Sequence, residues 1–274
     1  MDDEVFGTSN CRSTDATATE EMAQGRSIGR WRVVSHNRRN TSGSGDFTTL
    51  CERVPAYVLD LWINDWRQRH AKGEVIIVRY ADDFVIGFRE EADARKCLAA
   101  LQDRMTKFGL ELHPDKTRLI EFGRYAEERR TKRGDRPPET FDFLGFTHIS
   151  GKTRRGDFTI HRKTSRKKFQ AKLTALKEQL FRKRHDDLAE VGAWLQSVFR
   201  GWCQYYAVPG NNDRLRQFRD AIQVTWRNVL RRRSQRGRNL TWEKFSKLSK
   251  RWLPTPRILH PYPNVRFSNR QHPR

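Results

Sequence analysis

The chain has 274 residues and a formal net charge of +22, and it is long enough for one or two domains with hydrophobic cores. No run approaches the roughly 18 apolar residues that a membrane span needs, and the start is acidic and polar, so we expect a cytoplasmic protein with no membrane partner. Cys11, Cys51, Cys97 and Cys203 lie far apart, without a Cys-x-x-Cys pair, which argues against a disulfide framework or a zinc site.

The positive charge is concentrated in the last part of the chain. Residues 151–274 carry 31 Lys and Arg against 8 Asp and Glu, a net charge of +23, whereas residues 51–150 carry 18 of each and residues 1–50 carry 6 against 7. A folded region this basic repels itself unless a polyanion neutralises it. Nucleic acid is therefore the leading partner class.

The first fifty residues are rich in Ser, Thr, Asn and Gly and show no apolar period. This composition predicts a leader over residues 1–50 that is disordered or unrelated to the rest of the chain. From Val54 the composition changes, and the dense apolar and aromatic residues of 57–66 predict a mostly buried helix.

The next segment predicts a β-hairpin. Val75–Tyr80 and Phe84–Phe88 are β-branched and aromatic runs on either side of Ala81-Asp82-Asp83. An amphipathic helix comes after it, with apolar residues from Ala94 to Phe108 at spacings of three and four, ended by Gly109. Further along we expect a strand over 118–122, a surface loop over 124–139 and a strand over 141–146.

Beyond about residue 160 the apolar period is helical. Four stripes predict four helices, at 169–180, 188–205, 215–229 and 245–252, the last with Thr241 as its N-cap. Trp202, Trp226 and Trp252 lie on these stripes, which favours core positions over base-stacking platforms. Basic residues fall between the stripes, so the pattern predicts a helical bundle with positive outer faces.

Asp82 and Asp83 are adjacent carboxylates at the expected tip of a hairpin. Their mutual repulsion falls when a divalent cation binds, and Mg²⁺ is usually held by one or two carboxylates together with substrate phosphates. Two such ions suit nucleotidyl transfer. A bare Asp-Asp pair is nevertheless more often a solvated turn, so the surrounding sequence has to decide.

Three motifs occur in a fixed order: Tyr80-Ala81-Asp82-Asp83, then Gly109 to Thr117 with Lys116 near its end, then Phe143-Leu144-Gly145-Phe146. Their order and spacing resemble the palm of group II intron reverse transcriptases, which are also maturases, and the resemblance covers residues 54–262. It implies an RNA-directed DNA polymerase with a splicing role, acting on RNA template, DNA primer and deoxynucleoside triphosphates with Mg²⁺.

The resemblance implies a role for each matching residue. Asp82 would be a shared ligand of the catalytic metals and Asp83 a second ligand, with Tyr80 near the primer end or incoming nucleotide. Lys116 would lie near the nucleotide phosphates, although a solvated lysine after a Pro-Asp turn remains open. Phe143, Leu144, Gly145 and Phe146 would form the primer grip, and Gly145 would permit close approach of the primer backbone. Core packing of the two phenylalanines is an equal alternative and is compatible with this role.

The resemblance also divides the chain. It implies an α+β fold: a partial palm of antiparallel sheet and helices over residues 51–150, then an all-α bundle with thumb-like helices at 151–185, a maturase domain at 186–262 and a tail at 263–274. Structured intron RNA would be the main partner. The phosphate contacts that we expect come from two basic clusters, Arg166, Lys167 and Lys168, and Arg231, Arg232 and Arg233.

One part of the family pattern is not found. Full-length members carry fingers and another metal-binding aspartate upstream, whereas Asp46, Asp60 and Asp65 do not lie in such a motif. We therefore expect a truncated or frame-shifted copy. Three interpretations stay open: a polymerase active only when the missing N-terminal half is supplied in trans, an RNA-binding maturase fragment without chemistry, and a decayed gene product with neither role.

Overall fold

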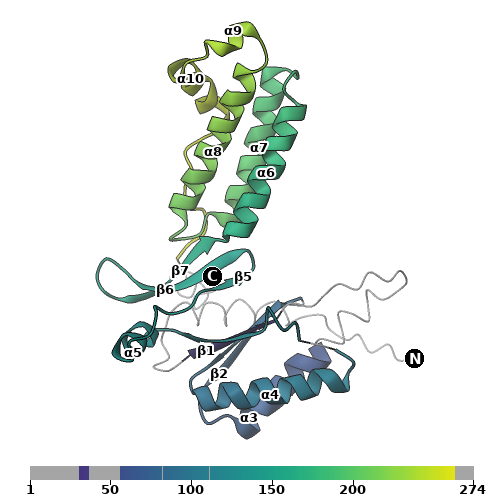
Figure 1. The fold of residues 1–274 in the computed structure, drawn as a ribbon, viewed down its shortest axis with the longest axis vertical. Helices are drawn as coiled ribbons and strands as arrows, with labels where there is room; N and C mark the ends of the chain where they lie inside the picture. Colours follow the sequence, from purple (N-terminus) through teal and green to yellow (C-terminus); the bar gives the residue numbers. More distant parts are fainter. Residues whose placement is uncertain (1–30, 37–55, 82, 111, 263–274) are drawn as a thin grey trace, which may run out of the picture. The chain divides into compact units, whose positions relative to one another are not determined.

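A computed structural model of the protein describes residues 31–36, 56–81, 83–110 and 112–262. The chain divides into two compact units (Figure 1). The sheet unit comprises the chain up to Leu144 together with Ile149–Ile160. The helical unit comprises Gly145–His148 together with the chain from His161 onward. The predicted α+β class is confirmed.

The sheet unit is built on a four-stranded sheet. Its strands are β1 (Trp31–His36), β2 (Val75–Tyr80), β3 (Asp83–Phe88) and β4 (Arg118–Phe122), in the order β2-β3-β1-β4, and the β2–β3, β3–β1 and β1–β4 pairs are antiparallel. The predicted hairpin and the predicted strand at 118–122 are thus confirmed.

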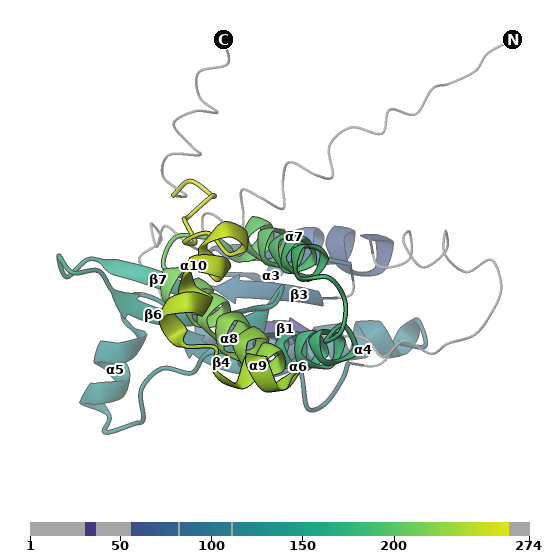
Figure 2. The same cartoon turned by 90° about the horizontal axis from the view of Figure 1, so that it is seen from above.

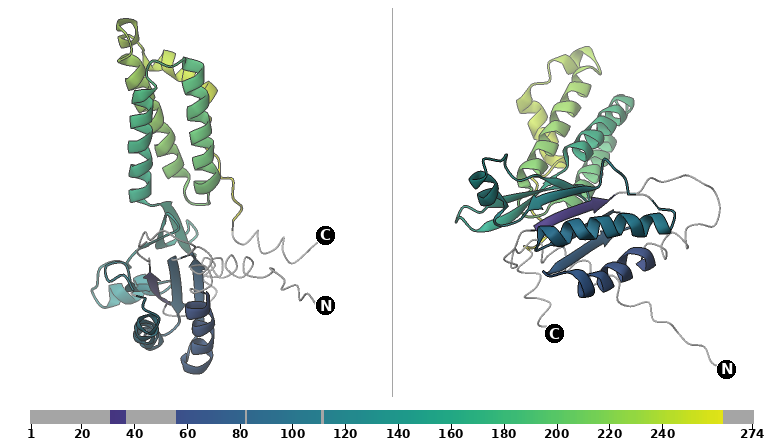
Figure 3. Two further views of the ribbon diagram at one scale, coloured as in Figure 1. Left: turned by 90° about the vertical axis from the view of Figure 1, so that its right-hand side faces the viewer. Right: turned by 60° about the horizontal axis from the view of Figure 1, so that its bottom comes forward.

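Each face of this sheet has its own core, because side chains alternate along a strand. Phe84, Ile86 and Phe88 of β3 face a cluster formed with η1 (Ala56–Asp60), α3 (Leu61–His70) and α4 (Glu91–Lys107). Figure 3 shows both helices against the sheet. Val85 of β3 faces the opposite way, into a cluster with β2, β4 and Phe143. The helices predicted before and after the hairpin are confirmed, and Gly109 comes directly after α4 and its C-cap, at φ +66°.

The leader was expected to be disordered or unrelated to the rest of the chain, and the first of these alternatives is wrong for residues 31–36. They form β1, which pairs with β3 from Arg32↔Phe88 to His36↔Phe84 and with β4 from Trp31↔Phe122 to Ser35↔Arg118. A central strand gains hydrogen bonds along both edges, so pairing with distant partners overrides a weak local signal. The predictions for residues 1–30 and 37–50 lie outside the described residues.

Two further segments differ from the predictions. The expected surface loop at 124–139 contains a helix, α5 (Ala126–Lys132), which is fixed because Arg129 and Arg133 form ion pairs with Glu121, a carboxylate buried in β4. Residues 151–164 were expected to begin thumb-like helices, but most of them belong to the strands β6 (Phe146–Lys152) and β7 (Phe158–Thr164). These two strands form a three-stranded sheet with β5 (Phe141–Phe143), in the order β5-β6-β7.

The helical unit contains the four predicted helices and one short addition. They are α6 (Arg166–Arg182), α7 (Leu188–Tyr206), α8 (Asn212–Arg231), α9 (Gln235–Arg238) and α10 (Trp242–Trp252). Figure 2 views α6, α7 and α8 roughly end-on, packed side by side. Thr241 caps α10 by accepting a hydrogen bond from the Lys244 N–H, as predicted.

The bundle core confirms the assignment of tryptophans to packing. Trp226 is fully buried and Trp202 is 8% exposed, and both belong to one hydrophobic cluster against which Trp252 packs. Cys97 and Cys203 are buried free thiols, and burial raises their pKa to about 12 and about 11, respectively. Among the described helices, none is both long and apolar enough to cross a membrane.

Candidate functional site

The predicted catalytic turn is the tip of the β2–β3 hairpin. Tyr80 pairs directly with Asp83, so the loop between the strands consists of Ala81 and Asp82. Two-residue hairpin loops favour turns whose central residues have positive φ, and Ala81 has φ +52°. A residue with a Cβ is strained there, which is common at functional positions. Asp82 itself lies outside the described residues.

Tyr80 and Asp83 project from the same face of the sheet because they form a cross-strand pair. By strand alternation this is the face of Val78 and Val85, opposite to the face covered by α3 and α4. Tyr80 is 66% exposed and Asp83 is half-buried. The turn therefore presents an aromatic ring and a carboxylate together on a face that α3 and α4 leave open.

The side chain of Arg79, which sequence reasoning did not identify as important, supports this turn. Arg79, the residue before Tyr80, donates hydrogen bonds to the Asp60 carboxylate from Nε at 2.8 Å and from Nη2 at 2.6 Å. Its Nη1 donates to the Ala81 carbonyl at 3.1 Å. One guanidinium thus ties the end of η1 to the strained residue of the turn. The only available sequence signal was a basic residue beside the Tyr-Ala-Asp-Asp motif.

Replacing Arg79 with alanine should destabilise the sheet unit by about 1–3 kcal/mol, because charge-assisted hydrogen bonds are lost and the Asp60 carboxylate loses its guanidinium partner. Arg79→Lys, which keeps the charge but loses the planar fork, should fall between wild type and Arg79→Ala. Urea unfolding measured by tryptophan fluorescence gives the difference. Equal stability of all three proteins would contradict a supporting role for this contact.

Lys116 lies at the same end of the sheet as the turn. Ser35 of β1 pairs with Val85 of β3 on one side and with Arg118 of β4 on the other. Asp83 lies two positions before Val85, and Lys116 lies two positions before Arg118. Two strand spacings, roughly 10 Å, separate β3 from β4. Lys116 is exposed in a turn, and its own backbone N–H donates a hydrogen bond to the His113 carbonyl. The register therefore puts Lys116 at the same end of the sheet as Asp83, two strands away; its predicted place near the nucleotide phosphates stays a prediction.

The two described aspartates that precede the hairpin are already engaged in ion pairs. Asp60 is bound by Arg79 and Asp65 by Arg69, at 2.6 and 2.8 Å. The strand beside β3, Trp31–His36, has no acidic residue, and no group of three or more His, Cys, Asp or Glu side chains that could hold a metal ion occurs within the described residues. Mg²⁺ is usually held by one or two carboxylates together with substrate phosphates, so the binding of Mg²⁺ by Asp82 and Asp83 stays a prediction.

The predicted primer grip forms a second tight turn of the same kind. Leu144 and Gly145 connect β5 to β6 at φ +50° and +76°. Leu144 and Ala81 are the two non-glycine residues with positive φ in the part of the chain that the structure describes. Both predicted functional motifs therefore place a strained residue at a hairpin tip.

Packing accounts for the residue types in this second turn. Phe143 is 7% exposed in the core of the sheet unit. A Cβ on Gly145 would lie 2.8 Å from the Tyr206 hydroxyl, so only glycine fits, and the Gly145 carbonyl accepts a hydrogen bond from the Ser165 N–H at 2.9 Å. Close approach of Tyr206 is thus a sufficient reason for Gly145, and its contact with primer stays a prediction.

The predicted phosphate-binding residues differ in their surroundings. Arg166, Lys167 and Lys168 form the exposed first turn of α6, which has no acidic residue there. Positive charge at a helix N-terminus opposes the helix dipole, so these residues weaken the isolated helix and favour an external anion.

The second predicted basic cluster is divided. Arg233 donates to the carbonyls of Asp186 and His185 at 2.9 and 3.1 Å, and Arg231 donates to the Arg238 carbonyl at 3.2 Å. Arg233 thus holds the loop between α6 and α7, and Arg231 holds the end of α9. Arg232 instead lines a groove between α6 and α8.

This α6/α8 groove has a volume of about 560 Å³ and is lined by Thr174, Lys177, Glu178, Phe181, Arg184, Thr225, Asn228, Val229 and Arg232. The Phe181 ring is half exposed, and the Arg184 guanidinium lies 4.7 Å from its centroid. An exposed ring among three cations suits a nucleic-acid backbone with an accessible base. Sequence reasoning found Arg232 but missed Lys177, Phe181 and Arg184 as its neighbours. These three follow one another along α6 and its C-terminal end, and only the packing of α6 beside α8 brings them to Arg232.

Comparison with known proteins gives one result for the sheet unit. Residues 50–148 match the model of a family described as reverse transcriptase (RNA-dependent DNA polymerase). The matched segment contains the β2–β3 hairpin, Lys116 and the Leu144-Gly145 turn. Among curated proteins, none matches the chain.

Proposed function

We propose that this chain, whose residues 50–148 match reverse transcriptases, derives from a group II intron reverse transcriptase/maturase and combines a partial polymerase palm with an RNA-binding helical unit. The observation that carries the proposal is the strained two-residue turn of Tyr80-Ala81-Asp82-Asp83, at the tip of a buried hairpin inside the matched segment. The hydrogen bonds of Arg79 to the Asp60 carboxylate and to the Ala81 carbonyl add support, because they hold the turn in place.

In this proposal Asp82 and Asp83 hold Mg²⁺, whose chemistry would stabilise the attacking and leaving oxygens of nucleotidyl transfer. Tyr80, exposed on the same face as Asp83, orients the primer end or the nucleotide. Lys116, at the same end of the sheet, neutralises the phosphates of the leaving group. The Leu144-Gly145 turn supports the primer. In this proposal any further metal ligand comes from outside the residues that the structure describes, since these hold no group of three or more potential ligands.

Local oxidative cleavage tests the metal assignment without requiring polymerase activity. Fe²⁺ and ascorbate in place of Mg²⁺ should cleave the chain close to Asp82, and mass spectrometry locates the cut. Asp82→Asn and Asp83→Asn should each reduce this cleavage, while Asp115→Asn, an exposed aspartate beside Lys116, is the matched control. Cleavage that Asp82→Asn leaves unchanged would rule out the assignment, as would primer extension that is insensitive to that substitution.

The alternative function is an RNA-binding maturase fragment that assists splicing of a structured intron RNA without catalysis of its own. The net charge of +23 over residues 151–274 and the α6/α8 groove favour this alternative for the helical unit. Basic helices can grip RNA backbone and shape without reading sequence. Both functions use the same RNA-binding surface, so they differ only in the chemistry of the Asp-Asp turn.

Replacing Lys177, Arg184 and Arg232 together with glutamine should weaken RNA binding and lower the slope of log K against log salt by up to about 3, since each phosphate contact releases counterions. The charge-matched control replaces Lys244, Lys247 and Lys250 on α10, in the same unit. Fluorescence anisotropy of a structured RNA over a salt series measures both slopes. Equal slopes for the two triple variants would contradict a role for the α6/α8 groove.

A further inference from the structure

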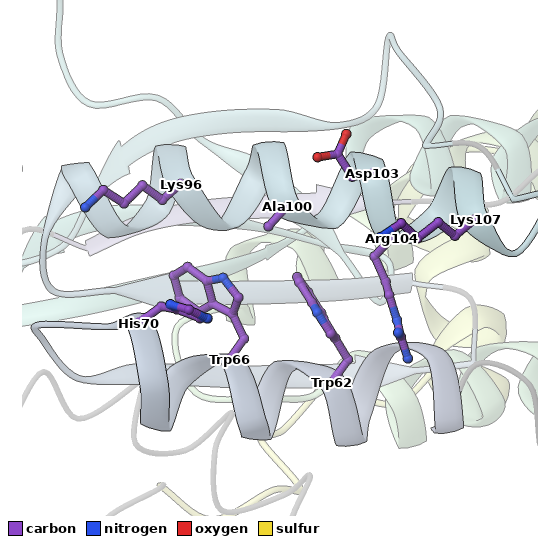
Figure 4. Close-up of a pocket in the computed structure, with 8 residues that line it drawn as sticks. All are labelled: Trp62, Trp66, His70, Lys96, Ala100, Asp103, Arg104 and Lys107. Atoms are coloured by element: carbon purple, nitrogen blue, oxygen red, sulfur yellow. The ribbon is translucent and has the colours of Figure 1, made fainter.

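A second groove lies between α3 and α4 of the sheet unit. It has a volume of about 410 Å³ and is lined by Trp62, Trp66, His70, Lys96, Ala100, Asp103, Arg104 and Lys107 (Figure 4). Because α3 and α4 cover the sheet face opposite to Tyr80 and Asp83, this α3/α4 groove is separate from the candidate catalytic turn.

One wall of the groove is aromatic. Trp62, Trp66 and His70 succeed each other at one-turn spacing along α3, with ring centroids 6.5 Å apart for the two indoles and 5.8 Å apart for Trp66 and His70. Trp66 is 6% exposed and belongs to the core, whereas Trp62 is half-buried and His70 is exposed. Figure 4 shows both indoles rising from α3 toward α4. Trp62 and His70 thus offer ring surface beside a fixed Trp66.

The other wall is cationic. Lys96, Arg104 and Lys107 come from α4, and the two lysines are exposed. The Arg104 side chain is held across the groove because Nε donates to the Val58 carbonyl at 3.3 Å and the guanidinium lies 4.6 Å from the Phe108 ring centroid. Asp103, the acidic lining residue, points away from α3 (Figure 4). Lys96 and Lys107 are eleven positions apart, about 16 Å along the helix.

We propose that the α3/α4 groove binds a short segment of single-stranded nucleic acid, with a base on Trp62 and phosphates on Lys96 and Lys107. Aromatic stacking combined with a line of cations is the recognition mode of sequence-tolerant single-strand binding. An acidic peptide would satisfy the cations but would leave the partly exposed rings without a flat partner. This inference does not depend on the proposed polymerase function.

The test uses the whole chain labelled with 5-fluorotryptophan and read by ¹⁹F NMR, with an eight-nucleotide oligo(U) as the probe. The Trp62 signal, identified through Trp62→Leu, should shift and saturate as probe is added. Replacing both Lys96 and Lys107 with glutamine should weaken binding at Trp62 by roughly tenfold or more while the remaining tryptophan signals of the free protein stay in place, which shows that the fold is intact. The two lysine substitutions change exposed side chains only.

A matched pair of changes separates this groove from the basic helical unit. Lys167→Gln with Lys168→Gln removes two exposed cations from α6, so it should lower total affinity for the probe but leave the Trp62 titration unchanged. The proposal fails if Trp62 does not respond at saturating probe, or if the Lys96/Lys107 variant titrates like wild type. A response of Trp62 to hexaglutamate at lower concentration than to oligo(U) would assign the groove to an acidic peptide instead. None of these readouts requires Asp82 or primer extension.

Discussion

Deleting residues 1–36 should abolish cooperative unfolding of the sheet unit. The deletion removes β1, and with it five paired positions with β3 and five with β4. The edges of β3 and β4 would then be unpaired and ready to associate with other chains. The lost ladders are worth several kcal/mol, against a total stability of about 5–15 kcal/mol for a typical domain.

A point substitution tests the same strand with a smaller perturbation. Val34 pairs with Ile86 on one side and Leu119 on the other, so Val34→Pro removes a ladder hydrogen bond from a central strand. Val34→Thr keeps β-branching and serves as the control. Circular dichroism during thermal unfolding and light scattering measure both stability and aggregation. A Val34→Pro protein that melts like Val34→Thr would show that β1 does not stabilise the sheet.

The same substitution at two glycines of α7 should change stability in opposite directions. At Gly192 an added Cβ would lie 2.6 Å from the Trp252 ring, whereas at Gly201 nothing lies within 4 Å. Gly201→Ala should stabilise the helical unit by about 0.5–1 kcal/mol, because alanine loses less backbone entropy in a helix. Gly192→Ala gains the same propensity but should be destabilising by about 1–3 kcal/mol net, since Trp252 must leave its place against the bundle.

Urea unfolding of both glycine variants measures this difference directly. Gly192 is buried and Gly201 is exposed, but both lie in α7 and undergo the same chemical change. The contribution of helix propensity therefore cancels when the two changes in unfolding free energy are subtracted. The remaining difference reports the contact with Trp252. Combining Gly192→Ala with Trp252→Ala should recover part of the loss, because the smaller side chain leaves room for the new methyl group. A Gly192→Ala variant as stable as Gly201→Ala would show that α10 does not pack closely on α7.

The β2–β3 turn could be predicted from the sequence of this molecule, whereas the α3/α4 groove could not. The turn was predicted because β-branched runs, a short polar loop and two aspartates are all local features. The groove was not predicted, although Trp62 and Trp66 are conspicuous, because the cations opposite them lie about thirty or more positions later, on α4. Only the packing of α3 beside α4 shows that these side chains share one cavity.

The hydrogen bonds between Arg79 and Asp60 likewise join residues that are distant in the sequence, so they were not predicted. Nothing in the sequence distinguishes Asp60 from Asp65, since both lie in one helical segment. In the structure Asp60 ends η1 beside β2 and binds Arg79, while Asp65 binds Arg69 four residues along α3. The first ion pair supports the candidate site, and the second is an exposed helix pair of little energetic weight.

The sequence by itself determined the hairpin, its Asp-Asp turn, the helices with continuous apolar stripes and the location of the positive charge, because each depends on residues within a few turns of one another. Tertiary structure alone decided that Trp31–His36 is a central strand, that α5 is held by buried Glu121, and which arginines brace loops and which line a groove. Those outcomes depend on pairing and burial between distant segments, and a local pattern carries no information about a partner that only folding supplies.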